Sequence, residues 1–199
     1  MYPPAQGVPC NKTMGKRAVT TNRTKLLSLL LLTLALATAC AHPYVEPTDG
    51  PRAKLRFVSL KSSGPGDVFV HSLTDENCKK TPLLIAALSG PAPVNNRKRM
   101  DMPLGENYAD RDITEVMIKA NQPYAFDFYW WAADLAVGMS NCNVTTSFRP
   151  IDGHQYEAVY TLGRDNCAVD VFDITKGDDE QYHREIELSA VRTGAQCKW

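Results

Sequence analysis

The sequence lacks the short motifs by which most hydrolases and metal proteins are recognised. It contains no H-E-x-x-H, H-x-H or G-x-S-x-G pattern, and no two of its six cysteines have the C-x-x-C spacing of zinc ribbons and redox sites. Histidine is scarce, with four residues in a chain of 199. Because no nucleophile can be paired with a base, we predict that the protein is not an enzyme and that it holds no metal and no cofactor.

Acidic residues are absent before Glu46, whereas five basic residues lie between Lys12 and Lys25. The apolar run that follows, from Leu26 to Ala41, has 16 residues. A membrane-spanning helix needs about 20 residues. A basic start, a short apolar run and a small-residue exit are typical of a secretory signal. We therefore predict that residues 1–39 are a signal peptide, with Met14 as an alternative start.

The end of this segment, Ala37-Thr38-Ala39-Cys40, resembles the lipobox of bacterial lipoproteins. In that family, Cys40 would receive a thioether-linked diacylglycerol and, after cleavage before it, an acyl chain on its new amino group. Ala41 stands where an aspartate would favour retention in the inner membrane, so the resemblance implies sorting to the outer membrane. The resemblance covers about 30 residues. The alternative is an ordinary signal peptide that leaves Cys40 as a plain thiol.

The 160 residues from Cys40 onward suffice for a single domain with a sizeable core. All 22 acidic residues but only 17 of the 22 basic ones lie in this part, which gives a net charge of about −5 and argues against a nucleic-acid partner. Residues 41–52 contain three prolines, one glycine and no periodic apolar pattern. We predict a lipidated flexible tether over residues 40–52 and one domain over residues 53–199.

No segment shows a sustained apolar stripe with helical spacing, whereas short runs with a period of two recur between turn residues. The expected strands are Lys54–Leu60, Asp67–Leu73, Leu83–Leu88, Thr114–Ala120, Tyr124–Trp130, Val144–Phe148, Tyr156–Leu162, Cys167–Ile174 and Glu185–Val191. This pattern predicts an all-β protein, an antiparallel β-sandwich that is immunoglobulin-like or transthyretin-like in general form. We expect residues 144–148, 156–162 and 167–174 to form a meander within one sheet. Residues 91–112 have no clear element and are expected to form a long, partly mobile excursion.

Four cysteines other than Cys40 lie in the exported part, and an even number in such a chain indicates two disulfides. They are Cys78, Cys142, Cys167 and Cys197. Three connectivities are open, and we favour Cys142–Cys167 with Cys78–Cys197 because the loop between Cys142 and Cys167 is short. Alternate strands of a flat sheet lie about 9.6 Å apart, more than the roughly 7 Å that a disulfide spans. The favoured pairing therefore requires Cys142 to precede its strand.

The aromatic run from Tyr124 to Trp131 provides the candidate binding face. Alternation places Phe126 and Phe128 on the core side, and it places Asp127, Tyr129 and Trp131 together on the opposite side. A surface of Tyr, Trp and Asp suits a sugar ring or a protein partner. The alternative is that a loop covers Trp131. By the same alternation, His71 is expected to face solvent, whereas His154 lies in a turn without a fixed environment.

Three charged clusters are interpreted as solvated loop faces. Calcium loops alternate oxygen ligands around a glycine, a pattern that none of these clusters completes. The clusters are Asn95-Asn96-Arg97-Lys98-Arg99, Asp110-Arg111-Asp112-x-x-Glu115 and Asp178-Asp179-Glu180.

Together these inferences predict a membrane-anchored envelope lipoprotein with a non-enzymatic binding or structural role, an accessory component of an envelope assembly. Its expected partners are the membrane, through the lipid anchor, and an envelope protein. The alternative is a periplasmic inhibitor or immunity-type lipoprotein that acts on an enzyme through the loop at residues 91–112. A hydrolase is the weakest hypothesis because no nucleophile–base pair is visible.

Overall fold

The fold was analysed in a computed structural model that describes residues 43–61, 66–73, 82–89, 98–104, 108–134, 138–163, 166–177 and 181–193. For residues 61, 133, 134 and 138–140 the backbone alone is described. The predicted signal peptide and the candidate lipidation site Cys40 lie outside the described residues. So do Cys78 and Cys197, the second pair of the favoured disulfides, and the acidic cluster at residues 178–180.

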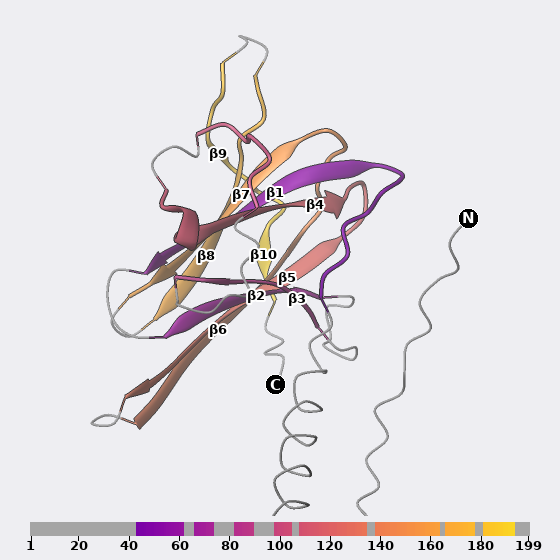
Figure 1. The fold of residues 1–199 in the computed structure, drawn as a ribbon. Coiled ribbons are helices and arrows are strands. Elements are labelled where there is room, and N and C mark those ends of the chain that lie inside the picture. The colour runs from indigo at the N-terminus through magenta and orange to yellow at the C-terminus, as the bar shows by residue number, and fades with distance from the viewer. Residues whose placement is uncertain are drawn as a thin grey trace, which may run out of the picture. The chain divides into compact units, whose positions relative to one another are not determined.

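The described residues fold almost entirely into strands, which confirms the all-β prediction. Successive strands are β1 (Arg52–Lys61), β2 (Asp67–Leu73), β3 (Leu83–Leu88), β4 (Ile113–Lys119), β5 (Tyr124–Asp134), β6 (Gly138–Phe148), β7 (Gln155–Leu162), β8 (Cys167–Asp173), β9 (Glu185–Ile186) and β10 (Val191–Arg192) (Figure 1). A single 3-10 turn, η1 (Asp110–Asp112), precedes β4. The bounds of β2 and β3 equal the predicted ones. The pattern of β2 alternates, whereas β3 is a continuous apolar run.

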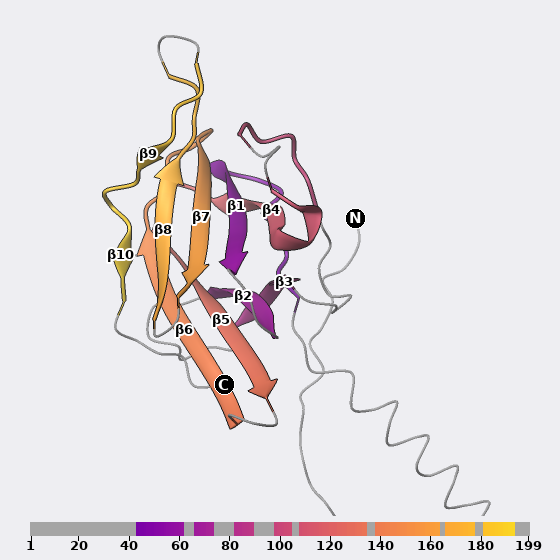
Figure 2. The same cartoon turned by 90° about the vertical axis from the view of Figure 1, so that its left-hand side faces the viewer.

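Two five-stranded sheets make up the sandwich. One sheet, here called the β1 sheet, has the order β4-β1-β7-β8-β9, and the other, the β5 sheet, has the order β10-β6-β5-β2-β3. The pair β1–β7 is parallel, whereas the other strand pairs of the described residues are antiparallel. Figure 2 shows β5 and β6 as a long hairpin that extends past the ends of the strands around it.

Aromatic side chains from both sheets fill the space between them. Phe57 of β1 meets Phe126 and Phe128 of β5 edge to face, with ring centroids 5.2 and 5.7 Å apart. Phe128 in turn stacks on Tyr160 of β7, with a centroid distance of 5.2 Å. All four rings are buried. The predicted core side of β5 is therefore confirmed, and these rings supply much of the apolar burial that holds the sheets together.

The disulfide Cys142–Cys167 is present, as the favoured pairing predicted, but it is reached by a different route. Its two Cα atoms lie 6.2 Å apart, and Cys142 sits inside β6 rather than before it. The predicted meander is wrong because β6 belongs to the β5 sheet, whereas β7 and β8 belong to the β1 sheet. Facing strands of the two sheets bring the cysteines together across the core, so the spacing conflict within one sheet does not arise.

The beginning of the described chain differs from the expected flexible tether. The backbone N–H of Tyr44 donates to the carbonyl of Leu84 in β3, and its phenol donates to the carbonyl of Met117 in β4, both at 2.9 Å. Burial raises the pKa of the Tyr44 phenol to about 12. Glu46 forms an ion pair with Lys98 at 2.7 Å. This segment joins the edge strands of the two sheets and shields their open backbone groups.

The opposite edge is formed by the end of the described chain. The strand predicted over residues 185–191 is instead two short strands, because the chain turns at Leu188-Ser189 and changes sheet. β9 pairs with β8, and β10 pairs with β6. Alternation within residues 185–191 could not reveal this turn, since it contains neither glycine nor proline. Within the described residues, no helix has the length and apolarity that a membrane crossing requires.

Candidate functional site

Three charged side chains lie side by side on the outer face of the β1 sheet. Arg56 of β1 is opposite Glu115 of β4 on one side and opposite Glu157 of β7 on the other. Alternation explains this placement, because Leu55 and Phe57, the neighbours of Arg56, point into the core. All three charged side chains are buried although they are on the outer face.

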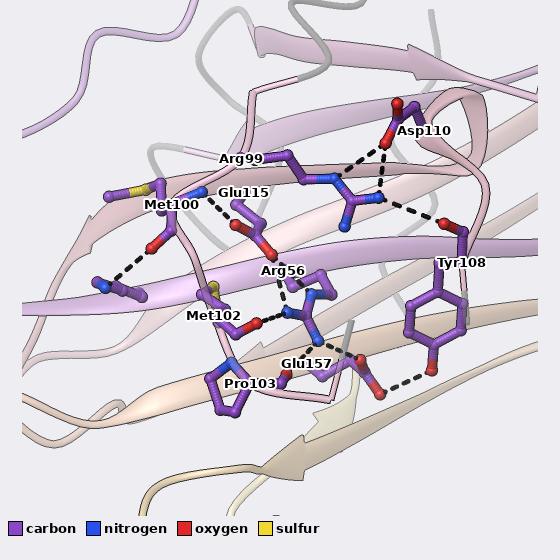
Figure 3. Close-up of polar contacts among 10 residues, drawn as sticks. Arg56, Arg99, Met100, Met102, Pro103, Tyr108, Asp110, Glu115 and Glu157 are labelled. Carbon is purple, nitrogen blue, oxygen red and sulfur yellow. Dashed lines mark hydrogen bonds and ion pairs between the residues drawn. The ribbon is translucent and has the colours of Figure 1, made fainter. Parts of the chain in front are cut away.

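The guanidinium of Arg56 links both carboxylates and two backbone carbonyls (Figure 3). Its Nε donates to Oε1 of Glu115 at 2.9 Å, and Nη1 donates to Oε2 of Glu157 at 3.0 Å. Nη1 also donates to the carbonyl of Pro103 at 2.8 Å, and Nη2 donates to that of Met102 at 2.7 Å. Arginine suits this role because its planar group offers five donors in a fixed geometry.

Residues 98–104 and 108–112, here called the strap, cover this network. The backbone N–H of Glu115 donates to the carbonyl of Lys98 at 3.0 Å, and the N–H of Met100 donates to the Glu115 carboxylate. Lys54 of β1 donates to the carbonyl of Met100 at 3.1 Å. The excursion expected over residues 91–112 is held in these parts by charged side chains that bind its backbone, which the sequence did not predict. Residues 91–97 and 105–107 lie outside the described residues.

Glu157 has two further partners, one from the strap and one from the end of the chain. The phenol of Tyr108 donates to Oε1 at 3.1 Å, and Nη2 of Arg184 lies 2.9 Å from the same oxygen. Arg184 also covers the ring of Phe172 at 3.8 Å from its centroid. Burial, followed by the charge of Glu157, raises the pKa of Tyr108. With its oxygens so engaged, Glu157 links β1, the strap and the end of the described chain.

Sequence reasoning missed this network. Arg56 and Glu157 were not singled out, and the assignment of Glu115 to a solvated loop face was wrong. A usable signal was present, because each of these charges is flanked on both sides by buried residues of a strand. Three such charges of complementary sign on three strands indicate a covered ionic cluster. Lys98 and Arg99 of the predicted basic loop are likewise engaged, with Glu46 and Asp110.

The outer face of the β5 sheet holds the predicted binding residues, but it buries one of them. Asp127 has no exposed surface, and its Oδ1 lies 2.9 Å from Nδ1 of His71 on β2. His71 is only 14 % exposed, so its predicted solvent-facing position is wrong. Oδ2 of Asp127 makes no hydrogen bond of normal geometry. Burial raises the pKa of Asp127, while the contacts with His71 and the nearby Asn143 oppose the rise.

Tyr129 and Trp131 remain accessible on the same face. Tyr129 is half-buried beside Phe69 of β2, with ring centroids 6.5 Å apart, and Trp131 is 40 % exposed. Gly66, with φ of +99°, passes close to this part of β5, where a Cβ would collide with the carbonyl of Trp131. The close approach needs glycine. The structure therefore separates the three predicted residues into a buried carboxylate and two accessible aromatic rings.

His154, which was predicted to lie in a turn, has a structural partner. Nδ1 of His154 lies 2.7 Å from Oδ2 of Asp173, whose Oδ1 accepts from the backbone N–H of Thr175 at 2.8 Å. The expectation that His154 has no fixed environment is thus wrong. In the described part of the chain, no group of three or more His, Cys, Asp or Glu side chains is arranged to hold a metal ion.

Comparisons of the chain with protein-family models, with curated proteins and with solved structures gave no match in any of the three. The geometry of the described residues therefore carries the functional argument.

Proposed function

We propose that this protein is a lipid-anchored β-sandwich of the bacterial cell envelope, sorted to the outer membrane, that acts by binding a protein partner. The sequence up to Cys40 supports the anchor, and the Cys142–Cys167 disulfide supports an oxidising compartment outside the cytoplasm. The titratable side chains described above hold the fold together. This use of histidines and carboxylates favours a binding role over hydrolysis.

The observation that carries the binding role is the exposure of Trp131 beside Tyr129. Both rings lie on the outer face of the β5 sheet, where Tyr129 and Trp131 of β5 are opposite Phe69 and Asp67 of β2. Figure 2 shows the long β5–β6 hairpin to which this part of β5 belongs. Trp and Tyr are enriched in protein interfaces, where a few such residues contribute most of the binding energy. An accessory component of an envelope assembly could bind its protein partner through apolar contact with these two rings.

The anchor is tested by replacing Cys40→Ser. We expect the variant to lose lipid attachment and either to leave the membrane fraction or to accumulate as an uncleaved precursor. The measurement is fractionation together with the mass of the N-terminal peptide. A variant that is processed and fractionates like the wild type shows that Cys40 carries no anchor.

The binding role is tested by Trp131→Ala with Phe128→Ala as the folding control. Trp131→Ala should weaken capture of a stoichiometric envelope protein by about 2 kcal/mol, roughly thirtyfold, and lower stability by about 1–2 kcal/mol. Phe128→Ala should lower stability by about 3–5 kcal/mol through the cavity it leaves. Thermal melts and quantitative co-purification from solubilised envelope measure the two effects.

A matched surface control is Ile151→Ala, which removes an exposed apolar side chain from the loop between β6 and β7. This variant should retain the partner. Equal loss of the partner with both alanine variants, or no loss with Trp131→Ala, contradicts the proposed binding face.

A further inference from the structure

The docked segment at the beginning of the domain leaves very little chain between the candidate anchor and the folded structure. Pro43 is already bridged to Leu84 of β3, and Tyr44 is hydrogen-bonded to both sheets. Only two residues separate Cys40 from Pro43. Fully extended, three residue steps span about 10–11 Å. A domain held this closely to Cys40 has one edge within reach of any bilayer that Cys40 enters.

The side chains of the docked segment alternate between the domain and solvent. Tyr44 and Glu46 are partly buried against the domain, whereas Pro43 and Val45 are exposed. Val45 is 77 % exposed, an unusual position for a β-branched apolar residue. The outward side of this short extended segment is therefore apolar.

The charge on the inward side of the segment is neutralised. Both carboxylate oxygens of Glu46 accept from Nζ of Lys98, at 2.8 and 2.7 Å. On the adjoining strand ends, Arg52 is paired in register with Lys119, and both are exposed. A bilayer thus meets an apolar ridge at Pro43 and Val45, beside a carboxylate at Glu46 whose charge is paired and beside two exposed cations. Asp49, farther along the segment, is exposed.

We propose that Pro43 and Val45 rest in the headgroup layer of the bilayer to which Cys40 is attached, an inference that depends on the proposed lipidation. The occupant of this surface is the lipid bilayer itself. The headgroup layer on each side of a membrane is roughly 5–8 Å thick, and a connection of at most about 10–11 Å keeps Pro43 within reach of this layer. The edge made by β3 and β4 then faces the membrane, and the edge made by β9 and β10 faces away.

The test uses full-length protein, lipidated in cells, purified and placed in vesicles of phosphatidylethanolamine and phosphatidylglycerol. Val45→Cys carries an environment-sensitive fluorophore, and Leu188→Cys is the matched control. Leu188 is exposed in the turn between β9 and β10, on the opposite edge. We expect the label at residue 45 to shift to the blue on vesicle binding and to resist aqueous iodide at least about threefold better than the label at residue 188.

Two further measurements separate the ways in which the proposal can fail. If the N-terminal peptide of the protein lacks the mass of an attached lipid, the proposed anchor and the membrane-facing edge both fall. If the protein is lipidated but iodide quenches both labels equally, the anchor stands and the membrane-facing edge is overturned. In the Cys40→Ser background, both labels should report water even when vesicles are present.

Discussion

The outer faces of the two sheets bury charge in different ways. On the β1 sheet, Arg56 lies between two carboxylates and also donates to two backbone carbonyls of the strap. On the β5 sheet, Asp127 pairs with His71 through one oxygen, while its other oxygen makes no hydrogen bond of normal geometry. Burial leaves a clear mark on Asp127, whose pKa is raised.

This difference shows what allows charged side chains to be buried on the outer face of a sheet. A buried charge is tolerated when its partners satisfy most of its hydrogen-bonding capacity, and it is costly when they do not. The strap supplies backbone carbonyls to Arg56 and a phenol to Glu157. The outer face of the β1 sheet (the β1 face) is therefore where the strap is held to the sheet. The outer face of the β5 sheet (the β5 face) retains accessible aromatic side chains at Tyr129 and Trp131.

The largest expected effect is that of Arg56→Met. Removing the guanidinium leaves Glu115 and Glu157 buried next to each other without the cation between them, which should lower the free energy of unfolding by about 3–5 kcal/mol. The measurement is urea unfolding at neutral pH. We also expect the strap to become sensitive to limited proteolysis, because two of its carbonyls lose their donor.

Lys54→Met provides the matched control on the same face of the same strand. Lys54 is only partly buried and donates to one strap carbonyl, so its loss should cost no more than about 1 kcal/mol. Similar losses for both variants contradict the central role of Arg56, and so does an unchanged protease pattern in Arg56→Met.

The strands themselves were largely predictable from the sequence. Apolar patterns located β1 to β8, because the core side of each strand is apolar and turn residues separate the strands. The largest difference is at β6, which begins at Gly138 rather than at the predicted Val144. Their partners were not predictable. Alternation assigns residues to a face, but it does not say that β6 joins β5 while β7 joins β1 in parallel. The Cys142–Cys167 disulfide was predicted correctly even though the assumed geometry was wrong.

The candidate sites were predictable only in part, because their burial depends on which neighbouring segments cover them. Alternation correctly put Asp127, Tyr129 and Trp131 on one side of β5, yet it gave no information on which of them a neighbour would cover. Arg56 and Glu157 were missed for the same reason. Their burial depends on the strap, whose sequence has no regular pattern, and on Arg184, 128 positions from Arg56 in the chain.

An intermediate effect is expected when one donor is removed from each face. Tyr108→Phe removes one of several donors to Glu157 and should cost about 1 kcal/mol. His71→Phe removes the side-chain donor to Oδ1 of Asp127 and should cost about 1.5–3 kcal/mol, as for hydrogen bonds to charged groups. Urea unfolding of the two variants in parallel measures the difference. A larger loss of unfolding free energy for Tyr108→Phe than for His71→Phe would contradict the idea that several donors to one buried carboxylate limit the cost of losing one of them.

The smallest and most specific effect concerns the pH dependence of Asp127. Because its pKa is raised in the folded protein, the folded state holds this proton more tightly than the unfolded state does. The stabilisation is then complete below the unfolded pKa of about 3.9 and is lost as pH rises through the folded pKa. Asp127→Asn cannot titrate, so its stability relative to the wild type should increase as pH is raised from about 4 to about 7.

The measurement is the difference in unfolding free energy between Asp127→Asn and wild type at several pH values, in which the titration of other groups largely cancels. Repeating it in the His71→Phe background separates the carboxyl from the imidazole it contacts. In that background His71 no longer opposes the rise that burial causes in the pKa of Asp127. The increase with pH in the stability of Asp127→Asn relative to its parent should therefore become larger. A difference that falls as pH rises would mean that His71 more than offsets the burial of Asp127, and the β5 face would then satisfy its buried charge as fully as the β1 face does.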